Sequence, residues 1–185
     1  LRQHRGKKIV IKYGGHAMGN KKLSESFSKD LSLLKEVGIN PIVIHGGGPQ
    51  IGAMLKKKNI ISNFVDGLRI TDKNTVKIVE EVLNKDINKK IVNEINKSGG
   101  RAKSLPGNKK NLIVAKKLII ETKNSDSNIE KILDLGFVGT PTSITTNLIN
   151  EVIFNNQIPV ISPLGMDKRG KIYNIKFFIR KMKSI

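Results

Sequence analysis

The chain of 185 residues contains no cysteine and no tryptophan. The absence of cysteine excludes disulfide bonds and thiolate metal sites, and it is compatible with a reducing compartment. No apolar run approaches the roughly 18 residues of a membrane-spanning helix, and the apolar residues 9–11 fall short of a signal-peptide core of about 7–15 residues. We therefore expect a cytoplasmic protein without a membrane partner.

Acidic residues are also few, since 15 Asp and Glu stand against 34 Lys and Arg and leave a formal charge of +19 at pH 7. Such a charge is typical of nucleic-acid-binding proteins. The lysines are scattered through every segment, however, and 2 Tyr and 6 Phe offer few rings on which bases could stack. We interpret the charge as a lysine bias of solvated surfaces that attracts anionic substrates, and nucleic-acid binding is the less favoured alternative.

Strand and helix patterns alternate through the first part of the chain. Residues 8–13 and 41–45 are apolar and predict buried strands. A helix is expected at 22–37, with Leu23, Phe27, Leu31 and Leu34 on its apolar side, and another begins at Pro49. This order predicts an α/β fold with a parallel sheet and ligands at the carboxyl ends of its strands.

The later patterns add a hairpin, two helices and several strands. Asp66-Gly67 predicts a hairpin within 64–70, and Asp72 is expected to cap a helix that runs to about Lys97. Short strands are expected at 102–105, 112–115, 118–121, 136–144 and 158–162, an exposed loop at 123–128, and a helix from Thr145 or Thr146 through Asn155.

Two glycine-rich loops follow the first two strands. They contain Gly14 and Gly15 in the first loop and Gly46, Gly47 and Gly48 in the second. Without side chains in the way, backbone N–H groups and a helix N-terminus can approach an anion closely. Taken alone, the second loop fits a tight strand-to-helix turn equally well. Neither loop is a Walker A sequence, and Ile51 stands where a G-x-G-x-x-G motif needs its third glycine.

Three kinds of side chain are candidates for chemistry. Lys12 ends an apolar strand beside glycines, where an anionic ligand explains it better than a solvated face does. Its ammonium group suits the charge that develops on a transferring phosphoryl group. Arg69 follows the hairpin turn and fits either bidentate capture of a carboxylate or a surface ion pair. His4, His16 and His45 share no metal-ligand spacing, so we expect no metal site, and His45 is expected to pack or hydrogen-bond at its strand end.

In combination, these motifs closely resemble the acetylglutamate kinase group of the amino acid kinase family. The resemblance rests on Ile-Lys-Tyr-Gly-Gly at 11–15, His-Gly-Gly-Gly-Pro-Gln-Ile at 45–51 and Asp-Gly-Leu-Arg-Ile-Thr at 66–71. It continues through 134–139, 158–163 and Tyr-Asn-Ile at 173–175, and it covers about residues 6–175. The first two motifs are common to amino acid kinases, whereas the hairpin and the Tyr-Asn-Ile segment indicate the narrower group.

The resemblance implies a three-layer αβα sandwich with a mainly parallel central sheet. The N-terminal lobe of this family holds N-acetyl-L-glutamate, and the C-terminal lobe holds ATP with Mg. The reaction phosphorylates the side-chain carboxylate in arginine biosynthesis, and full-length members form homo-oligomers. Carried over by motif, Lys12 is catalytic, Gly47, Gly48, Arg69 and Asn174 bind substrate, and Gly14, Gly15 and Gly46 shape the phosphate loops.

The end of the chain departs from the family pattern. Phe178 stands where the family has an aspartate, and the last residues are basic. We therefore expect three parts: a basic N-terminal stub at 1–8, an acetylglutamate-binding lobe at 9–175, and an aberrant basic tail at 176–185 in place of the ATP-binding lobe. A frameshift would explain the tail and leave the chain inactive. The alternatives are a divergent tail with its own role and a non-catalytic module for acetylglutamate binding or subunit association.

Overall fold

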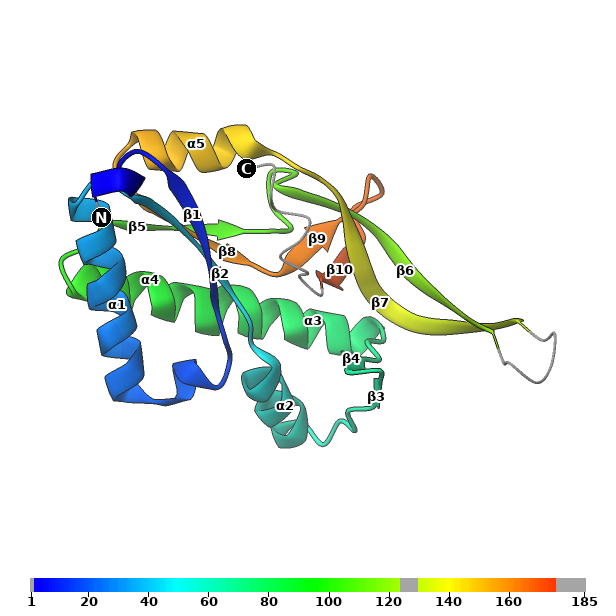
Figure 1. The fold of residues 1–185 in the computed structure, drawn as a ribbon. Helices are drawn as coiled ribbons and strands as arrows, with labels where there is room; N and C mark the ends of the chain where they lie inside the picture. The colour runs from blue at the N-terminus through cyan, green and yellow to red at the C-terminus, as the bar shows by residue number, and fades with distance from the viewer. Residues whose placement is uncertain (1, 124–129, 176–185) are drawn as a thin grey trace.

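A four-stranded parallel sheet forms the centre of the molecule (Figure 1), in the strand order β1-β2-β8-β5. The strands are β1 (Lys8–Tyr13), β2 (Asn40–His45), β5 (Ala102–Pro106) and β8 (Ile158–Ser162). The computed structural model describes residues 2–123 and 130–175. The basic tail at 176–185 and, apart from Lys123, the loop expected at 123–128 lie outside these residues. A mainly parallel central sheet is confirmed.

Helices cover both faces of this sheet (Figure 1), because its strands are apolar on both sides. One face carries α1 (Lys21–Glu36), α2 (Gly48–Lys57), α3 (Lys73–Glu81) and α4 (Lys89–Lys97), and the other carries α5 (Thr146–Phe154). Alternate residues of β2 serve the two layers. Val43 packs in the core of the first face, whereas Ile42 and Ile44 pack with Ile149 of α5. The predicted three-layer αβα sandwich is therefore confirmed.

The apolar residues of α1 predict its buried face in part, since Leu31 is buried and Phe27 packs against the core. Leu23 is 55% exposed, whereas Ser24, Ser28 and Ser32 are buried beside Leu31. The hydroxyls of Ser28 and Ser32 donate to backbone carbonyls one turn earlier, at 2.9 Å each, so their burial leaves no donor unsatisfied. Small side chains here allow α1 to lie close to α4, and hydrophobic spacing could not show that serines share the buried face.

The long helix expected from Asp72 to Lys97 is present over its predicted length, but it is not α-helical throughout. The Asp72 carboxylate accepts from the Thr75 N–H at 2.6 Å, and this bond lowers the pKa of Asp72. Between α3 and α4, however, residues Val82–Asn88 form a π-helical segment, η3. The helix ends before Gly99, whose φ of +87° favours glycine. Hydrophobic spacing could not reveal the π segment because its apolar residues still face the sheet.

A second set of strands closes on itself in the order β10-β7-β6-β9. It consists of β6 (Ile113–Lys123), β7 (Glu130–Ile144), β9 (Leu164–Met166) and β10 (Ile172–Ile175). The short strands expected at 112–115 and 118–121 are one strand with register shifts between Val114 and Ala115 and between Lys117 and Ile119. The sequence did not predict β9. In Figure 1 the paired β6 and β7 extend away from the sandwich.

The hairpin predicted at Asp66-Gly67 is present as β3 (Phe64–Val65) and β4 (Leu68–Arg69). Asp66 and Gly67 both have positive φ, 49° and 70°, as a two-residue hairpin turn of this kind requires. The Thr71 N–H donates to the Leu135 carbonyl of β7 at 3.0 Å, which anchors the hairpin to the second set of strands.

Two short 3₁₀ turns, η1 (Arg2–His4) and η2 (Ala17–Gly19), complete the described elements. Over residues 2–123 and 130–175, no helix has the length and apolarity that a membrane span demands.

Candidate functional site

A cavity of about 380 Å³ opens where β1, β2 and β10 meet the hairpin and the start of α2. This position is the carboxyl edge of the parallel sheet, where α/β proteins bind ligands. The cavity brings together most of the residues predicted from sequence: Lys12, Gly46, Gly47, Gly48, Arg69 and Asn174. Gly14 and Gly15 are not among its lining residues.

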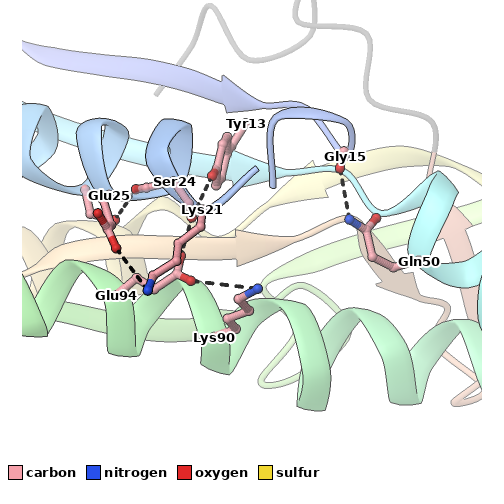
Figure 2. Close-up of polar contacts among 9 residues, drawn as sticks. Tyr13, Gly15, Lys21, Ser24, Glu25, Gln50, Lys90 and Glu94 are labelled. Atoms are coloured by element: carbon pink, nitrogen blue, oxygen red, sulfur yellow. Dashed lines mark hydrogen bonds and ion pairs between the residues drawn. The ribbon is translucent and has the colours of Figure 1, made fainter. Parts of the chain in front are cut away.

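The first glycine loop packs against the second and is not part of the cavity lining. Figure 2 shows Gln50 of α2 beside Gly15, and the Gln50 side-chain amide donates to the Gly15 carbonyl at 2.9 Å. A Cβ on Gly15 would lie 2.7 Å from Cδ of Pro49, so only glycine permits this approach. The Gly46 N–H donates to the Tyr13 carbonyl at 2.8 Å. The two loops are thus joined, and Gly15 shapes the site without lining it.

The second glycine loop places the N-terminus of α2 at the cavity. Gly47 occupies the N-cap position, and Pro49 lies in the first helical turn. A Cβ on Gly47 would meet terminal methyl groups of Leu83 and Ile87 at 2.6 Å, whereas Gly48 has open space at this position. Backbone N–H groups at such a helix start are free to bind an anion.

Arg69 is held on β4 with its guanidinium against the loop. Its Nη2 donates to the Gly48 carbonyl at 3.2 Å, and its Nη1 donates to the Ser62 hydroxyl. The guanidinium also lies 4.5 Å from the centre of the Phe64 ring. Burial lowers the pKa of Arg69, but a guanidinium remains cationic at neutral pH. Arg69 is only 7% exposed and forms no ion pair within the described residues, so the surface ion pair considered above is wrong.

Lys12 and Asn174 complete the polar lining from two other strands. Lys12 is exposed at the end of β1, and no carboxylate in residues 2–123 and 130–175 pairs with it. Asn174 is half-buried on β10, between Val138 of β7 and Leu164 of β9. None of the described lining residues is acidic. The cavity therefore carries two cations with no built-in counter-ion, which suits an anionic ligand.

The residue that follows Lys12 holds the end of β1 through a chain of hydroxyl contacts (Figure 2). Tyr13 stacks on Phe27 with ring centres 3.9 Å apart, and its hydroxyl donates to Ser24 at 3.0 Å. Ser24 in turn donates to the Glu94 carboxylate at 2.5 Å. Burial raises the pKa of Tyr13, so the phenol stays protonated and remains a donor. Sequence reasoning missed these contacts, because residues that bond directly lie up to 70 positions apart in the sequence.

His45 packs and hydrogen-bonds at the end of β2, as predicted. The side chain is 1% exposed, with Nδ1 2.8 Å from the Gly46 carbonyl and Nε2 3.1 Å from the Asn88 side-chain nitrogen. Burial lowers the pKa of His45 to about 4, so the ring is neutral at neutral pH. Asn88 carried no signal in the sequence, since it is one of many asparagines.

Comparison with known proteins relates this chain to a family of kinases. A model of the amino acid kinase family matches residues 7–177. An acetylglutamate kinase of Parvibaculum lavamentivorans is 53% identical over 167 residues, which are 90% of this chain and 55% of the relative. An acetylglutamate kinase of Rhodospirillum centenum is 50% identical over 175 residues, which are 95% of this chain and 57% of the relative. The chain thus spans little more than half the length of these relatives.

Solved structures give the same fold. The crystal structure of smu.665 from Streptococcus mutans aligns with a TM-score of 0.77 at 28% identity and covers 91% of this chain and 63% of that one. N-acetylglutamate synthase from Neisseria gonorrhoeae, in complex with coenzyme A and N-acetyl-glutamate, aligns with a TM-score of 0.75 at 19% identity. The match covers 95% of this chain and 38% of the synthase, and at this identity it shows the fold alone.

Proposed function

The chain belongs to the amino acid kinase family, and from this premise we propose that residues 9–175 form the acetylglutamate-binding lobe of an acetylglutamate kinase. The proposed reaction transfers the terminal phosphoryl group of ATP to the side-chain carboxylate of N-acetyl-L-glutamate, as a step of arginine biosynthesis. The observation that carries the proposal is the cavity itself. It unites Lys12, the second glycine loop, Arg69 and Asn174 without an acidic residue in its described lining.

The substrate has two carboxylates and an acetamido group, and the lining offers a partner for each kind of group. The guanidinium of Arg69 presents planar N–H donors that match one carboxylate. Its bonds to Gly48 and Ser62 hold it in place before the ligand arrives. The amide of Asn174 can donate to or accept from the substrate, because it makes no other side-chain hydrogen bond among the described residues.

The phosphoryl group requires a different set of contacts. The Lys12 ammonium and the N–H groups at the start of α2 would stabilise negative charge that develops during transfer. Loss of one such preorganised donor costs about 2.7–4 kcal/mol in the reaction barrier. ATP is the donor that the kinase family implies. Within residues 2–123 and 130–175 no cluster of three or more His, Cys, Asp or Glu could hold a metal ion.

The experiment that tests the proposal is a calorimetric titration of the purified chain with N-acetyl-L-glutamate, with L-glutamate as comparator. Selective binding that Arg69→Lys weakens supports the proposal, since lysine keeps the charge and loses the planar fork. Lys8→Ala is the control, because Lys8 is an exposed cation at the opposite end of β1. Failure of the folded chain to bind acetylglutamate would overturn the proposal.

A second measurement separates the kinase from a non-catalytic binding module. The chain is incubated with acetylglutamate and MgATP, and acyl phosphate is trapped with hydroxylamine. Hydroxamate that disappears in Lys12→Ala supports catalysis by this chain. Binding without hydroxamate would overturn the catalytic part and leave acetylglutamate binding or subunit association as the function of the chain.

A further inference from the structure

His45 and Asn88 form a buried pair behind the second glycine loop. Asn88 is 0% exposed and belongs to the π-helical segment η3. Its side-chain nitrogen lies 3.1 Å from Nε2 of His45 and 3.0 Å from the carbonyl oxygen of Val160 on β8. The pair therefore connects η3, β2 and β8 at the carboxyl edge of the sheet, and His45 is itself among the residues that line the cavity.

The hydrogen-bond inventory of this pair determines the tautomer of His45. The carbonyl of Val160 can only accept, so the amide nitrogen of Asn88 must face it as the donor. The second hydrogen of this nitrogen is then available to Nε2 of His45, which must act as an acceptor. A neutral imidazole with Nε2 as acceptor carries its hydrogen on Nδ1. That hydrogen is donated to the Gly46 carbonyl at 2.8 Å.

The bond to Gly46 orients the peptide group that enters the cavity. In a trans peptide the N–H of one residue points opposite to the preceding carbonyl. Holding the Gly46 carbonyl against His45 therefore aims the Gly47 N–H away from His45. This N–H has no hydrogen-bond partner among the described residues, and Gly47 lines the cavity.

The segment that carries Asn88 supports the same peptide by packing. Leu83 and Ile87 of η3 occupy the space where a Gly47 side chain would lie. Both side chains are buried, at 1% and 5% exposure. The π-helical turns thus hold the loop from two directions, through Asn88 and His45 on one side and through methyl groups on the other. π-helical segments within α-helices are frequent at functional sites.

We propose that His45 is a positioning residue, locked by Asn88 as the Nδ1–H tautomer, which presets the Gly46–Gly47 peptide for binding an anionic group of the substrate. The inference rests on the proposed function for the identity of that substrate. The arrangement of His45, Asn88 and Gly46 can be tested separately. Although His45 lines the cavity, it acts in this role through its bond to the backbone of the loop.

The test compares two substitutions, each of which keeps a nitrogen near the position of only one of the two ring nitrogens of His45. His45→Asn places an amide nitrogen near the position of Nδ1 and can still donate to Gly46. His45→Gln reaches the position of Nε2 and loses that donor. We expect acetylglutamate binding by His45→Asn to stay within roughly threefold of wild type and binding by His45→Gln to weaken roughly tenfold, the effect of one hydrogen bond. His16→Gln, an exposed histidine outside the cavity, is the control.

Long-range ¹H–¹⁵N correlation spectra of the wild-type imidazole provide a readout that needs no variant to fold. The expected result is a single neutral tautomer with the hydrogen on Nδ1. An Nε2–H tautomer, or His45→Gln binding as tightly as wild type, would overturn the proposal. If the wild-type chain does not bind acetylglutamate, the proposed function fails. In that case the tautomer of His45, measured in the wild-type chain, is the only test of the positioning role.

Discussion

The guanidinium of Arg69 donates to the carbonyl of Gly48 at 3.2 Å, which joins the β3–β4 hairpin to the first residue of α2. The same side chain also contacts Ser62 and the face of Phe64. These contacts place a buried cation beside the N-terminus of a helix, and both attract negative charge. A carboxylate bound between them would offset the repulsion between the guanidinium and the positive end of the helix dipole.

Replacement of Arg69 by lysine should therefore weaken acetylglutamate binding while the fold persists. A hydrogen bond to a charged group contributes about 1.5–3 kcal/mol, so the dissociation constant should rise by roughly 10- to 150-fold. Calorimetry measures the affinity, and circular dichroism verifies the fold. Unchanged affinity in a folded Arg69→Lys protein would show that the guanidinium does not hold the ligand.

If the wild-type chain forms acyl phosphate, Lys12→Ala should affect phosphoryl transfer far more than binding. Loss of one preorganised donor lowers the rate by about 10²–10³-fold, whereas an exposed ammonium adds little to ground-state affinity. The rate of hydroxamate formation measures the first effect, and calorimetry measures the second. Lys8→Ala, on the same strand, should alter neither quantity. Equal losses of binding and rate would assign Lys12 to substrate binding instead.

Alanine substitutions at Gly47 and Gly48 should separate folding from binding. A Cβ at Gly47 would meet buried methyl groups of Leu83 and Ile87 at 2.6 Å, so the free energy of unfolding should fall by about 1–3 kcal/mol. A Cβ at Gly48 meets nothing within 4 Å, so stability should change by less than about 0.5 kcal/mol. Because Gly48 lines the cavity, its substitution should weaken acetylglutamate binding. Urea denaturation and calorimetry give the two quantities, and the reverse pattern would contradict the packing described here.

The burial of His45 predicts a specific pH dependence of stability. Its pKa is about 4 in the folded chain against 6.5 for an exposed histidine, so between these values the unfolded state binds more protons. The free energy of unfolding should therefore rise with pH from about 4 to about 6.5, by on the order of 3 kcal/mol from this group, and then level off. Urea denaturation at several pH values measures the slope. His45→Asn removes the titrating group and should flatten this window; an unchanged slope would assign the effect to other residues.

Ser24→Ala should destabilise the chain although it deletes only a hydroxyl. The change leaves the buried Tyr13 hydroxyl without its acceptor and removes a donor from Glu94, so a loss of about 1–3 kcal/mol in unfolding free energy is expected. Ser26→Ala, on the exposed side of α1, is the matched control and should change stability by less than about 0.5 kcal/mol. Thermal and urea denaturation provide the comparison. Equal effects of the two substitutions would mean that the hydroxyl chain in Figure 2 adds no stability.

Much of the site was predictable because its signals are local. Two apolar strands are visible in the sequence, one ending in Lys12 and one ending before Gly46. In a parallel sheet, the last residues of both strands lie at the same carboxyl edge. The Asp66-Gly67 turn placed Arg69 on a hairpin. By contrast, no local pattern showed that Gly15 packs against Pro49 and lies outside the cavity lining. Which of two adjacent loops lines the cavity depends on how α2 packs.

The amino-acid sequence by itself determined the alternation of buried strands and helices, the two glycine loops and the hairpin, because each follows from the spacing of neighbouring residues. Only the tertiary structure decided that serines fill part of the buried face of α1, where the helix widens into η3, and that His45 is neutral. Ser24 and His45 contact partners far away in the chain, Glu94 and Asn88, and burial in the packed layers keeps His45 neutral. Burial and hydrogen bonding between such distant groups arise only when the layers pack, so no local pattern of residues could reveal them.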